Sequence, residues 1–251
     1  MKKDMLRNIE LLLFAFILIL LIFNQVQLYQ LNQSINTLVP QKKAVDKGGP
    51  KDVNVDFYVM AYCPYGNQAE ELLAQAYDVI GSKASFNPHY VIYANYQGGG
   101  TNYCMDNGNY CSMHGIQELN QGIRELCVNK YMGIASYFEF VKAMNAQCSA
   151  SNADTCWEAV ATGLKLDTAK ITQCEETEGL DLVKAEKALN DQLGVQGSPA
   201  VFINGVQYSG ARSVEGFLGG ICAKFSDKPA ECNTVVTTQP TTTTTTAAGC
   251  G

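Results

Sequence analysis

Cys63 and Pro64 stand where a strand pattern gives way to a helix pattern. Alternate residues from Val53 to Val59 are apolar, which is typical of a half-buried strand. Apolar residues from Ala69 to Ile80 then recur at helical spacing. Unpaired N–H groups and the helix dipole at a helix N-terminus stabilise a thiolate and lower the thiol pKa. The pattern therefore predicts that Cys63 is an exposed nucleophile; a half-buried structural cysteine is the alternative.

A second motif with chemical meaning is Gly197-Ser198-Pro199-Ala200, which leads into the apolar run Ala200–Ile203. A proline before a buried strand can be cis, although a trans proline at a strand start is the ordinary alternative. Asn204-Gly205 then predicts a tight hairpin turn, with a return strand from Val206.

Taken together, Cys63-Pro64-Tyr65-Gly66, the Ser198-Pro199 motif and Phe202-Ile203-Asn204-Gly205 resemble the thioredoxin superfamily. More narrowly they resemble members with a helical insert, such as bacterial periplasmic DsbA-type oxidoreductases. The resemblance implies an α/β, thioredoxin-like fold over residues 53–232. It also implies that Cys63 attacks disulfides and that the cis-proline loop at Ser198 and Pro199 holds the partner chain beside it.

Gly66 departs from the superfamily pattern, because dithiol members carry a second cysteine at that position. Exchange within the motif is therefore impossible, and a monothiol mechanism remains, in which a small thiol or another cysteine releases Cys63. Cys250 could be that resolving thiol, because the 18 residues after Cys232 can extend roughly 60 Å. The alternative is that Cys250 links to another molecule or has no role.

Two further resemblances lie downstream. Cys111-Ser-Met-His114-Gly115-Ile-Gln-Glu118 resembles the gamma-interferon-inducible lysosomal thiol reductase signature, Cys-Gln-His-Gly-x-x-Glu-Cys. One residue is inserted before His114, and Leu119 replaces the second cysteine. Residues 156–232 resemble the luminal region of plant vacuolar sorting receptors, which are binding proteins. This likeness favours the alternative function, a redox-inactive thioredoxin-fold module that binds peptides or proteins.

Ten cysteines and only two histidines indicate disulfides in an oxidising compartment. Short loops suggest three pairs, and a fourth pair could tie the helical region together; the guess is Cys104–Cys111, Cys148–Cys156, Cys222–Cys232 and Cys127–Cys174. A metal site at Cys104, Cys111 and His114 is the less favoured reading, because no fourth ligand is evident. We expect no metal and no cofactor.

The chain divides into four parts. Residues 1–28 carry Lys2, Lys3 and Arg7 before the apolar run Leu11–Phe23. They predict a cytoplasmic tip and an uncleaved signal-anchor transmembrane helix, with a cleaved signal peptide as the alternative. Residues 29–52 are predicted to form a stalk, residues 53–232 the folded domain, and residues 233–251 a Thr-rich disordered tail.

Within the domain, a second strand is expected at Tyr90–Tyr93 and a helical insert at about residues 115–193. The expected helices of the insert cover residues 118–131, 136–146, 156–164, 168–174 and 180–193. The fold class is therefore α/β, a thioredoxin-like fold with a large helical insertion, preceded by one transmembrane helix.

The formal net charge of −6 and the absence of a basic block beyond the N-terminus exclude nucleic acid as a partner. The combined prediction is a membrane-anchored thiol–disulfide oxidoreductase or isomerase that uses Cys63 at the cell surface, in the periplasm or in a lumen. Its expected partners are disulfide-containing or thiol-bearing proteins and an external thiol reductant. A lone nucleophile suits reduction or isomerisation better than net oxidation.

Overall fold

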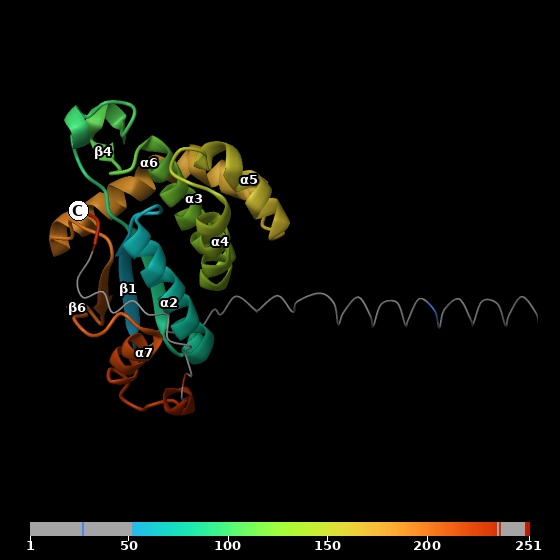
Figure 1. The fold of residues 1–251 in the computed structure, drawn as a ribbon, viewed down its shortest axis with the longest axis vertical. Coiled ribbons are helices and arrows are strands. Elements are labelled where there is room, and N and C mark those ends of the chain that lie inside the picture. The colour runs from blue at the N-terminus through green and yellow to red at the C-terminus, as the bar shows by residue number, and fades with distance from the viewer. Residues whose placement is uncertain (1–26, 28–51, 235, 237–248) are drawn as a thin grey trace, which may run out of the picture. The chain divides into compact units, whose positions relative to one another are not determined.

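The structure is a computed structural model that describes residues 52–234, 236 and 249–251, together with Gln27 (Figure 1). The expected anchor and stalk lie outside these residues apart from Gln27 and Asp52, as does most of the Thr-rich tail. Within the described part of the chain, no helix is both long enough and apolar enough to cross a membrane.

A four-stranded mixed sheet in the order β2-β1-β5-β6 forms the centre of the domain. Its strands are β1 (Asn54–Val59), β2 (Ser85–Tyr90), β5 (Ala200–Ile203) and β6 (Val206–Gln207). The first two strands are parallel, and Phe57 of β1 lies opposite Pro88 of β2 and Val201 of the antiparallel β5. The expected hairpin at Asn204-Gly205 is confirmed, since it joins β5 to β6.

The second strand differs from the expectation of Tyr90–Tyr93, because β2 ends at Tyr90. In its sequence, Ser-Phe-Asn-Pro-His-Tyr, the buried residues Phe86, Pro88 and Tyr90 alternate with polar ones, and the proline makes this alternation difficult to recognise as a strand. The proline is tolerated because β2 is an edge strand of the sheet.

The open side of this edge is capped by helix α6 (Thr168–Leu193). Glu186 accepts a hydrogen bond from the backbone N–H of Tyr90 at 2.9 Å, and Asn190 accepts one from the N–H of Ile92 at 2.7 Å. The two side chains lie one helical turn apart, which matches alternate residues along the extended chain. Another strand therefore cannot pair with these N–H groups.

Six long helices surround the sheet (Figure 1). Two belong to the basic fold, α2 (Pro64–Ile80) and α7 (Val214–Cys222). Four occupy the region of the expected insert: α3 (Ile116–Met132), α4 (Ile134–Gln147), α5 (Ala153–Gly163) and α6.

Helix α6 is one continuous helix, where the sequence led us to expect two. Gly179 lies in its middle but does not break it, because that position faces α3 closely. An added Cβ there would lie 3.1 Å from Cγ2 of Ile123. Gly179 therefore serves the close packing of two helices. Asp167 is the N-cap of α6, since its side chain accepts a hydrogen bond from the N–H of Lys170.

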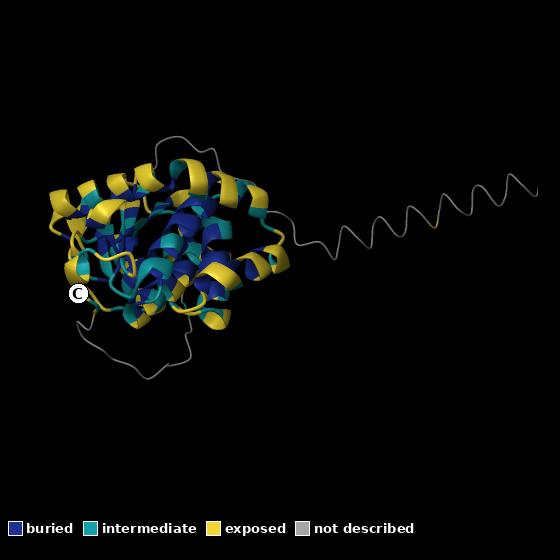
Figure 2. Ribbon diagram, turned by 90° about the horizontal axis from the view of Figure 1, so that it is seen from above, coloured by how far each residue is buried: buried dark blue, intermediate teal, exposed yellow. Residues whose placement is uncertain are grey.

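The sheet separates two apolar clusters, and the buried residues lie between the helices and the sheet (Figure 2). Val55, Phe57 and Val59 belong to the large core, which also contains residues of α2, α3, α4 and α7. Tyr58 and Met60 alternate with them and belong to a smaller cluster. That smaller cluster also contains Cys63 and Cys250, so β1 directly supports the candidate site.

All ten cysteines are paired in five disulfides. Four of these coincide with the guessed pairs: Cys104–Cys111, Cys148–Cys156 and Cys222–Cys232 from short loops, and Cys127–Cys174 as the pair that ties the helical region together. Cys104–Cys111 joins the two strands of a small hairpin, β3 (Cys104–Met105) and β4 (Tyr110–Cys111). Cys127–Cys174 links α3 to α6, and Cys148–Cys156 links the end of α4 to α5. Cys222–Cys232 fixes the segment after α7. The fifth disulfide joins Cys63 to Cys250.

Candidate active site at Cys63

Cys63 is the N-cap of α2, as the change of sequence pattern predicted. Its Sγ accepts a hydrogen bond from the N–H of Gly66 at 3.4 Å, and Pro64 begins the helix. Tyr65 is partly buried against the smaller apolar cluster. The prediction of an exposed thiol is wrong, since Cys63 is 0% exposed and its sulfur is in the disulfide with Cys250.

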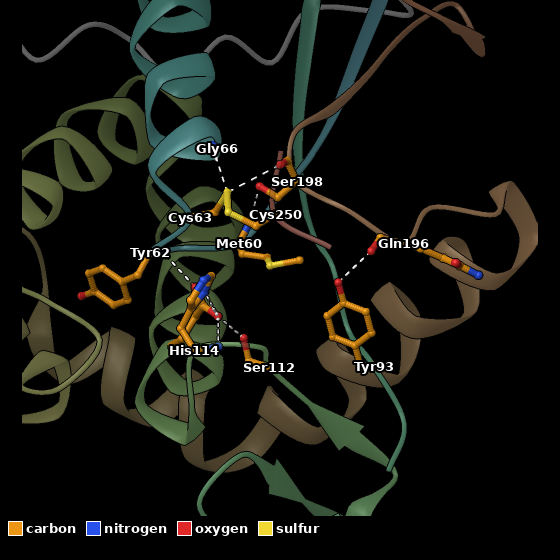
Figure 3. Close-up of a disulfide and its surroundings, with 11 residues drawn as sticks. Met60, Tyr62, Cys63, Gly66, Tyr93, Ser112, His114, Gln196, Ser198 and Cys250 are labelled. Carbon is orange, nitrogen blue, oxygen red and sulfur yellow. Dashed lines mark hydrogen bonds and ion pairs between the residues drawn. A yellow bond between two sulfur atoms is a disulfide. The ribbon is translucent and has the colours of Figure 1, made fainter. Parts of the chain in front are cut away.

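The loop before β5 lies beside this sulfur (Figure 3). The Ser198–Pro199 peptide bond is cis. The carbonyl oxygen of Ser198 lies 3.5 Å from Sγ of Cys63. The side-chain Oγ of Ser198 accepts a hydrogen bond from the N–H of Met60 at 3.0 Å. The structure thus brings together Cys63, Ser198 and Pro199, the three residues to which the superfamily resemblance gave roles.

Gly66 lies close to the same serine, a contact that no local sequence pattern indicated. A Cβ added to Gly66 would lie 2.5 Å from Oγ of Ser198 and 3.3 Å from the carbonyl oxygen of Met60. The Ser198 hydroxyl therefore fills the space that the side chain of a second motif cysteine needs. Any larger residue at position 66 requires Ser198 to move.

Cys250 adds a short antiparallel bridge to the cis-proline loop (Figure 3). The N–H of Ser198 donates to the carbonyl of Cys250 at 2.7 Å, and the N–H of Cys250 donates to the carbonyl of Ser198 at 2.8 Å. The Cα atoms of Cys63 and Cys250 are 6.1 Å apart, within the normal range for a disulfide. The segment Gly249–Gly251 is therefore bound to the site both covalently and through its backbone.

Glu118 anchors the turn that precedes Cys63. Its buried carboxylate accepts hydrogen bonds from the backbone N–H groups of Tyr62 at 2.8 Å and His114 at 3.1 Å, and from the hydroxyl of Ser112. The ring Nδ1 of His114 lies 2.8 Å from the same carboxylate, and this hydrogen bond raises the pKa of His114. The histidine and glutamate of the quoted signature thus position the Cys63 turn, a role that the sequence alone did not assign.

The metal alternative loses its ligands in this arrangement. Cys104 and Cys111 are joined to each other, and His114 is engaged by Glu118. The part of the chain that the structure describes holds no cluster of three or more groups that could bind a metal ion.

A buried chain of acids and tyrosines begins on α2, the helix that Cys63 starts. Glu70 accepts from the hydroxyl of Tyr137 at 2.6 Å, the Tyr137 and Tyr90 oxygens are 3.2 Å apart, and Tyr90 donates to Glu125. Burial raises the pKa of Glu70 and brings that of Glu125 to about 7. Helical glutamates usually face solvent, so nothing in the sequence distinguished these two.

A cleft of about 390 Å³ borders the cis-proline loop and the Gly249–Gly251 segment. It is lined by residues 193–200, Phe202, Gln207, Arg212 and residues 249–251. Tyr93 steadies one wall, because its hydroxyl donates to the carbonyl of Gln196 at 2.7 Å. The site therefore has room for polypeptide next to the disulfide.

Three solved structures share this fold at low sequence identity. The reduced disulfide bond oxidoreductase DsbG from Mycobacterium tuberculosis is 15% identical, with a TM-score of 0.50, covering 76% of this chain and 88% of that one. The reduced DsbA of the same organism is 15% identical, with a TM-score of 0.50, covering 76% of this chain and 92% of that one. The oxidised Mtb DsbA is 14% identical, with a TM-score of 0.51, covering 76% of this chain and 93% of that one.

The family match and the cis-proline loop beside a helix-capping cysteine define a protein of the thioredoxin-like class, whose fold is similar to that of DsbA and DsbG. Residues 67–222 match the vacuolar sorting receptor thioredoxin-like domain, and the chain belongs to that family. The match begins directly after Gly66 and ends at Cys222, so neither Cys63 nor Cys250 lies within it. A comparison with curated protein sequences found no match.

Proposed function

We propose that the protein is a thiol–disulfide oxidoreductase or isomerase in which Cys63 is the nucleophile and Cys250 is its resolving thiol. One observation carries the proposal: the helix-capping Cys63 is joined to Cys250 directly beside the cis-proline loop. Cys250 thus supplies, from the end of the described chain, the second sulfur that Gly66 cannot supply.

The exchange begins with the pair reduced. The Cys63 thiolate, stabilised by the N-terminus of α2, attacks one sulfur of a substrate disulfide and releases the other as a thiolate, which takes up a proton. The Cys250 thiolate then attacks Cys63, forms the Cys63–Cys250 disulfide and releases the second substrate thiol. The substrate is reduced, the pair is oxidised, and an external thiol reductant restores the pair. If a different cysteine thiolate of the substrate attacks the substrate sulfur of the mixed disulfide instead, a new substrate disulfide forms, the Cys63 thiolate is released and the result is isomerisation.

The proposal includes a location. Five disulfides persist best in an oxidising compartment. Together with the basic and apolar residues of 1–28, they favour an anchored domain on the extracytoplasmic side of a membrane, where disulfide-containing and thiol-bearing proteins are the partners. Protease added to intact cells or vesicles should digest the domain, whereas a domain protected until lysis would contradict this orientation.

A second function has its own support. The family model that matches residues 67–222 describes a sorting-receptor domain, and the matched residues do not include Cys63. Cys63 is also fully buried. Under this reading the chain is a redox-inactive binding module, and Cys63–Cys250 is a permanent cross-link that closes the structure.

Insulin reduction with two single variants separates the two functions. We expect the wild-type chain to reduce insulin with a thiol reductant, and Cys63→Ser to lose this activity. Cys250→Ser should accumulate mixed disulfides at Cys63, because no second thiol releases the substrate. The matched control Cys148→Ser/Cys156→Ser removes a disulfide of the insert and should stay active. Equal, background activity in the wild type and Cys63→Ser would favour the binding module.

A further inference from the structure

Glycines surround the bridge between Ser198 and Cys250 on both strands. Cys250 lies between Gly249 and Gly251, and Ser198 follows Gly197. A Cβ added to Gly249 would lie 2.8 Å from the carbonyl oxygen of Ser198. A Cβ added to Gly197 would lie 2.9 Å from the carbonyl oxygen of Cys250.

The contact at Gly251 is the tightest of the three. Its Cβ would lie 2.4 Å from the carbonyl oxygen of Gln196 and 2.7 Å from Cα of Gly197. Its φ of 122° is also one that residues with side chains rarely adopt. The obstructing atoms here and at Gly249 belong to the backbone of the cis-proline loop, so no side-chain rotation relieves the overlap.

From these contacts we infer that the exchange site is shaped for a cysteine flanked by glycine on both sides, and that its built-in occupant is the chain's own Gly249–Cys250–Gly251. An ordinary cysteine peptide, with a side chain on either neighbour, cannot take the same position against Ser198. The inference rests on the proposed function and adds a specificity to it. Outside proteins reach Cys63 when this segment has left, and those with glycines around the cysteine fit best.

The chemistry of entry is an ordinary exchange. An external thiolate attacks Cys250 or Cys63, the Cys63–Cys250 bond breaks, and the attacking thiol becomes part of a mixed disulfide. A second external thiolate attacks the external sulfur of that mixed disulfide, so the two external thiols leave as a disulfide and Cys63 and Cys250 are both left as thiols. Once the segment has moved away, the backbone N–H and C=O of Ser198, which had paired with Cys250, can pair with an incoming peptide.

The test uses the full chain with Cys250→Ser and two peptides, one with Gly-Cys-Gly and one with Ala-Cys-Ala, each activated as a mixed disulfide with 2-nitro-5-thiobenzoate. Attack by Cys63 on the peptide sulfur forms a peptide–Cys63 disulfide and releases the coloured thiolate, which gives the rate. We expect the glycine peptide to react about tenfold faster, because overpacking against backbone is not easily relieved. Equal rates would overturn the glycine specificity and leave the proposed function intact. If Cys63 reacts with neither peptide in the native protein but reacts with both after unfolding, the proposed function itself fails.

A second measurement tests the built-in occupant. Gly251→Ala in the otherwise unchanged chain should lower the equilibrium constant for closing Cys63–Cys250 against glutathione by about tenfold. Gly163→Ala is the matched control, since an added Cβ there meets nothing within 4 Å and its φ is ordinary. An unchanged equilibrium in Gly251→Ala would overturn the inference that glycine is required next to Cys250.

Discussion

At the scale of single residues, Ser198 connects every part of the site. Its Oγ accepts from the N–H of Met60, its carbonyl oxygen lies 3.5 Å from Sγ of Cys63, and its backbone pairs with Cys250. The same hydroxyl fills the space beside Gly66. A side chain at position 66 and the Ser198 hydroxyl compete for the same space in this arrangement, so a cysteine at position 66 would require Ser198 to move.

The first prediction follows from that exclusion. Gly66→Ala should lower the free energy of unfolding by about 1–3 kcal/mol, because the new Cβ overlaps Oγ of Ser198. Helix propensity alone predicts the opposite sign, since alanine is favoured over glycine inside a helix. Urea unfolding of Gly66→Ala, beside Gly163→Ala as a control on a glycine with open space, measures the difference.

The double variant Gly66→Ala/Ser198→Ala refines this test. Ser198→Ala alone leaves the N–H of Met60 without its partner, at a cost of about 1–3 kcal/mol. Because the alanine at 198 also removes the overlapping oxygen, the double variant should lose less stability than the sum of the two single variants. Strict additivity would mean that the two positions do not compete for space.

The residues that sequence reasoning found are those with local signals. Cys63 lies at a visible change of periodicity, and the Ser198-Pro199 loop precedes an apolar strand and a hairpin turn. The exclusion between Gly66 and Ser198 had no local signal, because the two positions meet only in the folded chain. The pairing of Cys63 with Cys250 was one possibility among several, since connectivity does not follow from cysteine spacing.

At the scale of elements, β2 and α6 were the hardest to predict. The strand is difficult to recognise in the sequence because Ser85, Asn87 and His89 are polar although only partly exposed, and because Pro88 is unusual in a strand. Helix α6 supplies the side chains that complete its edge. The other helices of the insert were found because their apolar residues recur at helical spacing. The long α6 was divided by mistake, because a glycine that serves helix packing looks the same in sequence as one that ends a helix.

His89 joins three elements and gives a pH-dependent prediction. It lies on β2, with Asp56 of β1 at 3.7 Å and Glu186 of α6 at 3.2 Å. Burial acts to lower the pKa of His89, but hydrogen bonds to Asp56 and Glu186, and their negative charges, raise it to about 9. The charged histidine therefore stabilises the folded state most below its unfolded pKa of about 6.5.

That contribution should disappear as the pH rises from about 6.5 through 9. We expect His89→Gln to cost roughly 1–3 kcal/mol near pH 6 and much less above pH 9, where the wild-type histidine is neutral in both states. Unfolding of both proteins at several pH values measures this. A cost that stays constant with pH would mean that His89 contributes by packing on Tyr58 rather than by charge.

At the scale of the whole molecule, the five disulfides fall into two groups. Four have sequence separations of 7, 8, 10 and 47 residues and fasten neighbouring elements of the domain. Cys63–Cys250 has a separation of 187 residues and joins the last described segment to the candidate active site. The proposal therefore gives the four shorter loops a structural role and the longest loop a catalytic one.

The central claim is that Cys63–Cys250 is a reversible redox pair while the other four disulfides are permanent. The most direct measurement is a titration of the folded full chain with reduced and oxidised glutathione, followed by thiol trapping and peptide mapping of all five pairs. We predict that Cys63 and Cys250 become reduced while the other eight cysteines stay paired and the fold, followed by circular dichroism, is retained. If Cys63–Cys250 resists reduction until the other disulfides open and the protein unfolds, it is a structural cross-link and the oxidoreductase account is contradicted.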